Sequence, residues 1–143
     1  MVNLLYFIPA LRILLGILYI ITSALKFPNL KGFAVIVASY NLLPRSLVKP
    51  AAYIQPFVEF AVGWWILSGK QLFYAAFAGL LLMIIADIFI IKGLLAKKRM
   101  ENCGCYGANI SVPLTWKKLA ENLIWTALFI ILMIAAKQLE AFM

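Results

Sequence analysis

Histidine is absent from this 143-residue sequence, and cysteine occurs only twice. Without an imidazole the chain lacks the commonest general base and the usual ligand of haem, which argues against a hydrolase and against an autonomous haem carrier. Two thiolates also fall short of the four ligands that structural zinc takes, so a metal site would have to be shared between chains. Acidic residues are scarce as well, with five Asp and Glu against 13 Lys and Arg.

Apolar residues dominate instead. They make up 66% of the chain, and the mean hydropathy is +1.01, whereas an ordinary soluble domain is about half apolar. The whole chain, residues 1–143, is therefore predicted to be a single all-α integral membrane domain. Its net charge of +8 lies in short connections between apolar runs, where anionic lipid headgroups explain it more simply than nucleic acid does.

Four apolar runs approach the roughly 20 residues that a membrane-spanning helix needs. They cover residues 4–25, 51–67, 71–95 and, from a start between 114 and 119, up to 136. The second run is predicted to begin after Pro50, and the last to leave a tail of seven residues. A shorter apolar piece at 30–43 is predicted to be an interfacial helix. This bundle of four transmembrane helices indicates a multi-pass protein of the cell membrane, and the first run is too long for a typical signal-peptide core.

Both cysteines lie in the only long polar stretch, residues 97–109, just before the last run. Cys103 and Cys105 are two residues apart, and a bend at Gly104 would shorten their separation from about 7 Å between Cα atoms into the disulfide range. So small a ring adds little stability by loop closure, which favours reversible oxidation. The cations that precede the pair would lower the pKa values of both thiols. They are Lys97, Lys98 and Arg99. Inert thiols and metal binding are the alternatives.

The ionisable residues Arg12, Glu59 and Asp87 fall well inside the apolar runs. Such groups are costly in a bilayer and usually face the bundle interior or a polar cavity. They could form a structural ion pair or hydrogen bond, line a site for a substrate, a quinone or a partner, or have no defined role. No cofactor is predicted, and a quinone is the one candidate. Ala75 and Gly79 offer a small face for close approach of a neighbouring helix.

The distribution of charge predicts the orientation. With four spans, the first and third connections share one side, and the termini share the other side with the second connection. The first side carries ten Lys and Arg and the second carries three. The positive-inside rule therefore places the cysteine loop in the cytoplasm.

Several motifs resemble those of the methylamine utilisation protein MauE family, within the wider DoxX-like group of four-helix membrane proteins. The most specific is Cys103-Gly104-Cys105-Tyr106-Gly107, which is similar to the C-G-C-F-G of that family. The weaker ones follow along the chain in order: Ser23-Ala24-Leu25-Lys26, Phe33, Tyr40-Asn41-Leu42-Leu43-Pro44, Glu59-x-x-x-Gly63 and Glu121-Asn122. Family members often carry a basic residue where this chain has Glu121.

The resemblance implies a membrane component of disulfide or electron handling, as in maturation of the disulfide-rich small subunit of methylamine dehydrogenase, beside a thioredoxin-like partner. Such maturation would take place outside the cytoplasmic membrane, opposite to the side that charge predicts, so the side stays open. Cys103 and Cys105 would exchange disulfides, with Tyr106 and Gly107 shaping the turn. The alternatives are an accessory or assembly subunit of a larger membrane complex, without turnover, and a small-solute or metal carrier.

Overall fold

The computed structural model describes residues 2–97 and 100–142, and within them every regular element is a helix. The elements are α1 (Val2–Lys26), the 3₁₀ turn η1 (Phe27–Asn29), α2 (Leu30–Ser39), α3 (Arg45–Ser68), α4 (Leu72–Leu95) and α5 (Trp116–Phe142). Helix α2 starts where the Asn29 side chain accepts a hydrogen bond from Gly32 N at 2.9 Å, which caps its first turn. The short helix expected after the first run is therefore present.

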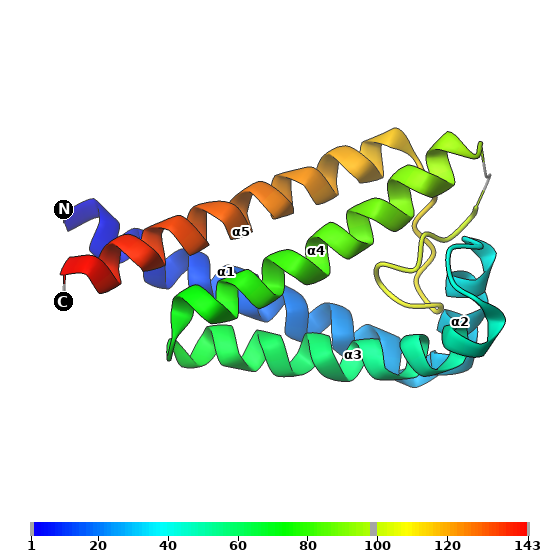
Figure 1. Cartoon of the computed structure of the whole chain (residues 1–143), viewed down its shortest axis with the longest axis horizontal. Coiled ribbons are helices and arrows are strands. Elements are labelled where there is room, and N and C mark those ends of the chain that lie inside the picture. Colours follow the sequence, from blue (N-terminus) through cyan, green and yellow to red (C-terminus); the bar gives the residue numbers. More distant parts are fainter. Residues whose placement is uncertain (1, 98–99, 143) are drawn as a thin grey trace.

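Four long helices lie side by side in the bundle (Figure 1). The most closely packed pairs are α1 with α3 and α4 with α5. A tight turn at Gly69, which has a φ of 74°, joins α3 to α4 as an antiparallel hairpin. The hairpin turn lies at the same end as the two termini, whereas α2 and the long α4–α5 loop lie at the opposite end.

Three of the described segments are long and apolar enough to cross a membrane, namely Leu5–Ser39, Leu72–Leu95 and Trp116–Phe142. Helix α3 is not among them, although it has 24 residues. Its polar residues Gln55 and Glu59 lower its hydropathy, but both turn toward the interior, where Glu59 is buried. The protein is therefore an all-helical, multi-pass membrane protein.

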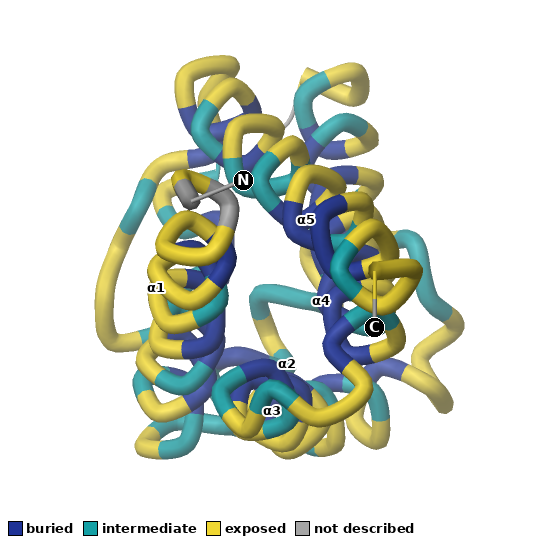
Figure 2. Tube along the Cα trace, turned by 90° about the vertical axis from the view of Figure 1, so that its left-hand side faces the viewer, coloured by how far each residue is buried: buried dark blue, intermediate teal, exposed yellow. Residues whose placement is uncertain are grey.

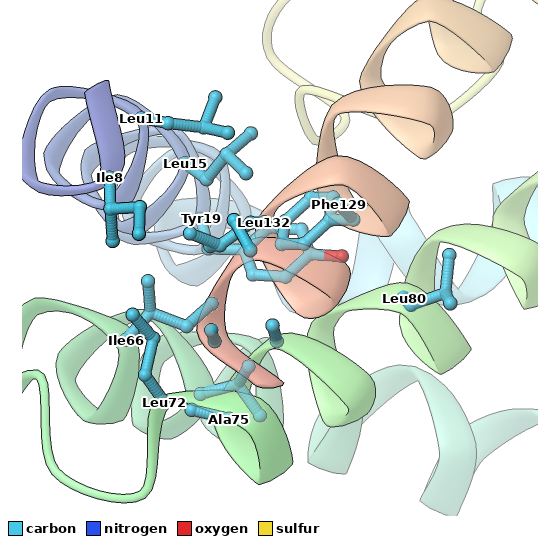
Figure 3. Close-up of a cluster of buried hydrophobic side chains, with 14 of the residues drawn as sticks. Ile8, Leu11, Leu15, Tyr19, Ile66, Leu72, Ala75, Leu80, Phe129 and Leu132 are labelled. Carbon is cyan, nitrogen blue, oxygen red and sulfur yellow. The ribbon is translucent and has the colours of Figure 1, made fainter. Parts of the chain in front are cut away.

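An apolar core fills the half of the bundle nearer the termini (Figure 3). The buried stretches of the long helices face inward around it (Figure 2). The small face expected on α4 is in use, since a Cβ on Gly79 would come within 2.5 Å of the Phe129 ring, and Ala75 is fully buried. The buried core residues are Ile8, Leu11, Leu15, Tyr19, Val62, Ile66, Leu72, Ala75, Ala76, Leu80, Met83, Phe129, Leu132, Ala135 and Ala136.

Three helix boundaries differ by four residues or more from those expected from the sequence. Helix α2 ends at Ser39 and not at residue 43, just before Asn41 takes a φ of 55°. Helix α3 begins at Arg45 and runs through Pro50, because a proline withholds one N–H but has a φ that fits a helix. Helix α5 continues to Phe142, so residues 137–142 of the expected tail are helical. Packing explains the extension, since Leu139 still contacts the apolar core.

Candidate functional site

The loop between α4 and α5 carries both cysteines and folds back on itself. Backbone hydrogen bonds join its two arms, from Cys103 N to Val112 O at 2.8 Å and from Leu114 N to Met100 O at 3.0 Å. The hydroxyl of Tyr40 donates to Cys103 O at 2.6 Å. Both backbone polar groups of Cys103 are thus held, one by the loop and one by the residue that follows α2.

A tight turn around the second cysteine depends on two glycines. Gly107 N donates to Gly104 O at 3.1 Å, and the φ angles of these residues, 84° and 85°, are ones that glycine adopts most readily. The side chain of Asn102 spans the turn, accepting from Gly104 N at 2.9 Å and donating to Gly107 O at 3.0 Å. A Cβ on Gly107 would lie 2.5 Å from Leu25 O, so the loop is docked tightly on the last turn of α1.

Both cysteines are free thiols, with Cys103 buried and Cys105 partly buried. A hydrogen bond from the Cys105 thiol lowers the pKa of Cys103 from 9.0 to about 6. The Cys105 backbone N–H and the charge of Lys118 act in the same direction, against the effect of burial. The same thiol contact, together with burial, raises the pKa of Cys105 well above its ordinary value. The pair therefore holds one negative charge at neutral pH, centred on Cys103.

Among the described residues, the cation whose charge acts on Cys103 comes from α5. Lys118 has a side chain only 3% exposed, and its Nζ lies 3.0 Å from Glu121 Oε1 and 4.4 Å from the centre of the Tyr106 ring. The Tyr106 hydroxyl donates to the same Glu121 oxygen at 2.9 Å. Burial and this hydrogen bond raise the pKa of Tyr106, which keeps the hydroxyl protonated as a donor. Lys118 thus supplies a positive charge in this region despite the acidic residue at position 121.

The upstream basic run does not have the role expected of it in the described residues. Lys97 is exposed and is not among the causes of either thiol's shifted pKa, and Lys98 and Arg99 lie outside the described residues. The charges that act on Cys105 belong to Lys118 and Lys26. Among residues 2–97 and 100–142, no group of three or more Cys, Asp or Glu could hold a metal ion.

Beneath the loop, Glu59 accepts three hydrogen bonds within the bundle. Lys26 Nζ lies 2.5 Å from Oε2 and Gln55 Nε2 lies 2.8 Å from the same oxygen, while the Thr22 hydroxyl donates to Oε1. The Lys26 and Glu59 side chains are only 6% and 5% exposed. Lys26, which directly follows the first apolar run, is thus the buried partner of the carboxylate.

Two cavities meet at Cys105. The smaller, of about 70 Å³, is called the polar cavity here because its lining adds Thr22, Lys26, Gln55, Glu59 and Asn122 to several apolar side chains. A larger, mostly apolar cavity of about 340 Å³ lies between α2, α3, α4 and the loop, and both cysteines line it. Lys26, Gln55 and Cys105 line both cavities. Cys105 therefore lies between the two cavities, whereas Cys103 lines only the larger one.

The other intramembrane polar residues predicted for the site are dispersed. Arg12 packs against Gly69 at the opposite end of the bundle, and Lys26 is the ion-pair partner of Glu59. Asp87 is buried and accepts a hydrogen bond from Thr126 at 2.6 Å on one oxygen. Asn122 is buried and lines the polar cavity, one helical turn beyond Lys118. Of these, only Asn122 belongs to the site.

The sequence singled out the cysteines, Glu59 and Asn122, but not the other polar residues that surround them. Spacing could have revealed several of these residues, because residues four apart share one face of a helix. The relevant pairs are Thr22 with Lys26, Gln55 with Glu59, and Lys118 with Asn122. No such local pattern points to Tyr40 or Asn102, whose roles depend on how the loop docks.

Comparison with known proteins gives two matches over most of the chain. The family model for methylamine utilisation protein MauE matches residues 4–136. The methylamine utilization protein MauE of Paracoccus denitrificans is 27% identical over 119 residues, which are 83% of this chain and 64% of that protein. The chain thus spans less than two thirds of the length of this relative. No solved structure matches.

Proposed function

The chain belongs to the methylamine utilisation protein MauE family, and from this premise we propose that it is a membrane-embedded thiol–disulfide redox protein acting through Cys103 and Cys105. The contact between the two sulfurs carries the proposal, since it holds one cysteine as a thiolate and the other as a protonated thiol. Such a pair has the groups that disulfide exchange requires.

The two cysteines have different roles in this exchange. A partner thiolate attacks the Cys105 sulfur of the disulfide, because Cys105 is the more exposed of the two. The sulfur–sulfur bond breaks and Cys103 leaves as a thiolate, which its low pKa favours. The partner's second thiol then attacks the mixed disulfide, and Cys105 leaves and takes up a proton. The partner dithiol becomes a disulfide, and the cysteine pair becomes a dithiol.

A four-span arrangement is part of the proposal. Helix α3 has 24 residues, about 36 Å at 1.5 Å per residue, which is enough to cross a bilayer of about 30 Å. Its outward face is apolar, with Ile54, Phe57 and Trp64 exposed, and its charged Glu59 is paired inside the bundle. Each of these features suits a lipid-facing helix of a single domain in the cell membrane.

The side of the membrane can be tested with introduced thiols. In a protein lacking Cys103 and Cys105, we expect Ser111→Cys in the loop and Lys70→Cys at the hairpin turn to label from opposite sides, because both positions are exposed at opposite ends of the bundle. A membrane-impermeant maleimide is applied to intact cells and then to opened cells. Equal labelling of both positions in intact cells would contradict the spans.

The name of the relative suggests a context for the exchange. Its printed name assigns that protein to methylamine utilisation, and we propose a similar accessory role here, in the maturation of a disulfide-rich protein. A thioredoxin-like protein is the proposed partner. Its two thiols match the two-electron chemistry of the cysteine pair, and the short loop leaves this chain little surface with which to select a substrate itself.

The test is to trap the redox state of the pair. Membranes are equilibrated in buffers with varied ratios of oxidised to reduced glutathione and quenched in acid. They are then alkylated before and after reduction and digested, and the mass of peptide 100–117 is measured by mass spectrometry. We expect the fraction that is alkylated only after reduction to rise with the oxidised fraction of glutathione. Complete alkylation of both cysteines at every ratio would refute the redox function.

A second candidate, a non-catalytic assembly subunit, is favoured by the burial of Cys103. That residue packs with Tyr40, Ile90, Leu114 and Leu119 in a small apolar cluster, as a structural thiol would. In this case Cys103→Ala would disturb the fold of the loop. Cys105→Ala, at the more exposed position, would leave assembly and activity of the larger membrane complex unchanged. The redox proposal expects both variants to fail equally.

A further inference from the structure

The apolar cavity beside the cysteine pair has the features of a ligand site. Its volume, about 340 Å³, falls within the range of about 300–1,000 Å³ that small-molecule pockets occupy. Aromatic side chains of Phe33, Tyr40 and Phe89 form part of its wall, and both cysteines complete it. An apolar chamber with a reactive pair in its wall is suited to a flat, apolar molecule that reacts with sulfur.

We propose that this cavity binds the ring of a lipid-soluble quinone, which reoxidises the Cys103 and Cys105 dithiol. The inference rests on the proposed function, because a disulfide donor must recover its disulfide after each exchange. The apolar cavity would thus bind a two-electron oxidant that enters from the bilayer.

Access to the cavity favours such an occupant over a water-soluble oxidant. Ile85, which lines the cavity, is 53% exposed on α4, a helix apolar enough to cross a membrane. This part of the cavity wall therefore lies at the flank of the bundle that lipid would cover. A molecule dissolved in the bilayer can enter by this route, whereas a charged oxidant would have to leave water.

The chemistry balances with the groups on the cavity wall. The Cys103 thiolate adds to a ring carbon of the quinone, and the ring takes up one proton. Cys105, as it loses its proton, attacks the Cys103 sulfur, so that a sulfur–sulfur bond forms and the sulfur–carbon bond breaks. The electron pair of that bond passes to the ring with a second proton. The thiolate and thiol together lose two electrons and one proton, the other proton comes from water, and the quinone becomes a hydroquinone.

The polar end of the cavity suits the two ring oxygens. Lys26 and Gln55 line both cavities, and the Lys26 ammonium lies 5.5 Å from the centre of the Phe33 ring on the apolar wall. A few polar groups at one end of an apolar pocket are what orient a ligand of this kind. Lys26 also connects the ring site with Glu59, which offers a route for the protons through the polar cavity.

The experiment follows oxidation of the reduced, purified protein by decylubiquinone, measured as loss of quinone absorbance and loss of alkylatable thiols. We expect one quinone to be consumed for each pair of thiols lost, at a rate that saturates with quinone. Val37→Trp should fill the cavity from α2 and slow the reaction about tenfold or more, since 1.4 kcal/mol of lost binding is a factor of ten. Val35→Trp is the matched control, because Val35 is 67% exposed on the same helix and does not line the cavity.

A second variant and a second assay keep the outcomes distinct. Leu43→Trp fills the same cavity from the segment after α2, in case the α2 variant does not fold. Exchange with dithiothreitol, which is small and water-soluble, should be unaffected in both. Suppose that the pair exchanges with dithiothreitol, but that the rate with quinone is the same in the Val37→Trp, Leu43→Trp and Val35→Trp variants as in the unchanged protein. The quinone site is then wrong and the proposed function stands. If the pair exchanges with neither reagent, both are wrong.

Discussion

The acidity of Cys103 gives the sharpest prediction. With a pKa of about 6, about 90% of this cysteine is thiolate at pH 7, against about 1% for a thiol of pKa 9.0. The rate of iodoacetamide alkylation at Cys103, located by tandem mass spectrometry, should therefore lose half of its plateau value only when the pH falls to about 6. An inflection at or above the ordinary thiol pKa of about 8.5 would refute this reading of the pair.

Substitutions should rank the causes of that acidity. Cys105→Ala removes the hydrogen bond that contributes most, so it should raise the Cys103 pKa further than Lys118→Met does. Cys105→Ser keeps a donor and should raise it less than the alanine variant. Lys117→Met is the matched control, since Lys117 is exposed beside Lys118, and it should leave the pKa unchanged. A shift as large in this control as in Lys118→Met would show that the buried ammonium has no special effect.

The same shift predicts how stability depends on pH. The Cys103 thiol takes up its proton near pH 9 when unfolded but near pH 6 when folded, so between these values the unfolded state binds more protons. The contribution of Cys103 to stability is therefore fully present above pH 9 and is lost as the pH falls through 6. Cys103→Ser should abolish this part of the dependence, as measured by unfolding in mixed micelles.

Three further predictions concern the surroundings of the pair. Removing one partner of the buried ion pair, by Lys26→Met or Glu59→Gln, should cost about 3–5 kcal/mol of unfolding free energy. The double variant should lose less than the sum of the two single losses, and a double variant whose loss equals that sum would refute the coupling. Gly107→Ala should cost about 1–3 kcal/mol from backbone strain alone and speed amide exchange in the loop. Tyr106→Phe should cost about 1.5–3 kcal/mol through its bond to a carboxylate, again by unfolding in mixed micelles.

Much of the fold could be predicted from the sequence because lipid-facing helices have a strong compositional signal. The family resemblance is confirmed, and the helices fall close to the expected apolar runs. The misplaced boundary at Pro50 has a local cause, since the φ of proline fits a helix. Val48 and Ala52, two residues to either side of Pro50, are buried, so packing holds this first part of α3.

The site was only partly predictable, since it is assembled from residues far apart in the chain. Cys103 and Cys105 stood out because thiols are rare here, and Glu59 because a carboxylate is costly in an apolar run. Its partner was not evident, because Arg12 lies within the first run and Lys26 directly follows it, and charge alone does not distinguish them. Only the docking of α1 on α3 does so, by placing the last turn of α1 beside Glu59.

The apolar core has a consequence for energy conservation. It lies between the polar cavity at the cysteine end and the region around Arg12 at the other end, and it contains no charged residue. In the proposed function, protons released or taken up at the thiols would therefore exchange with the aqueous compartment on the loop's own side. Electron transfer by such a pair would then leave the proton gradient across the membrane intact.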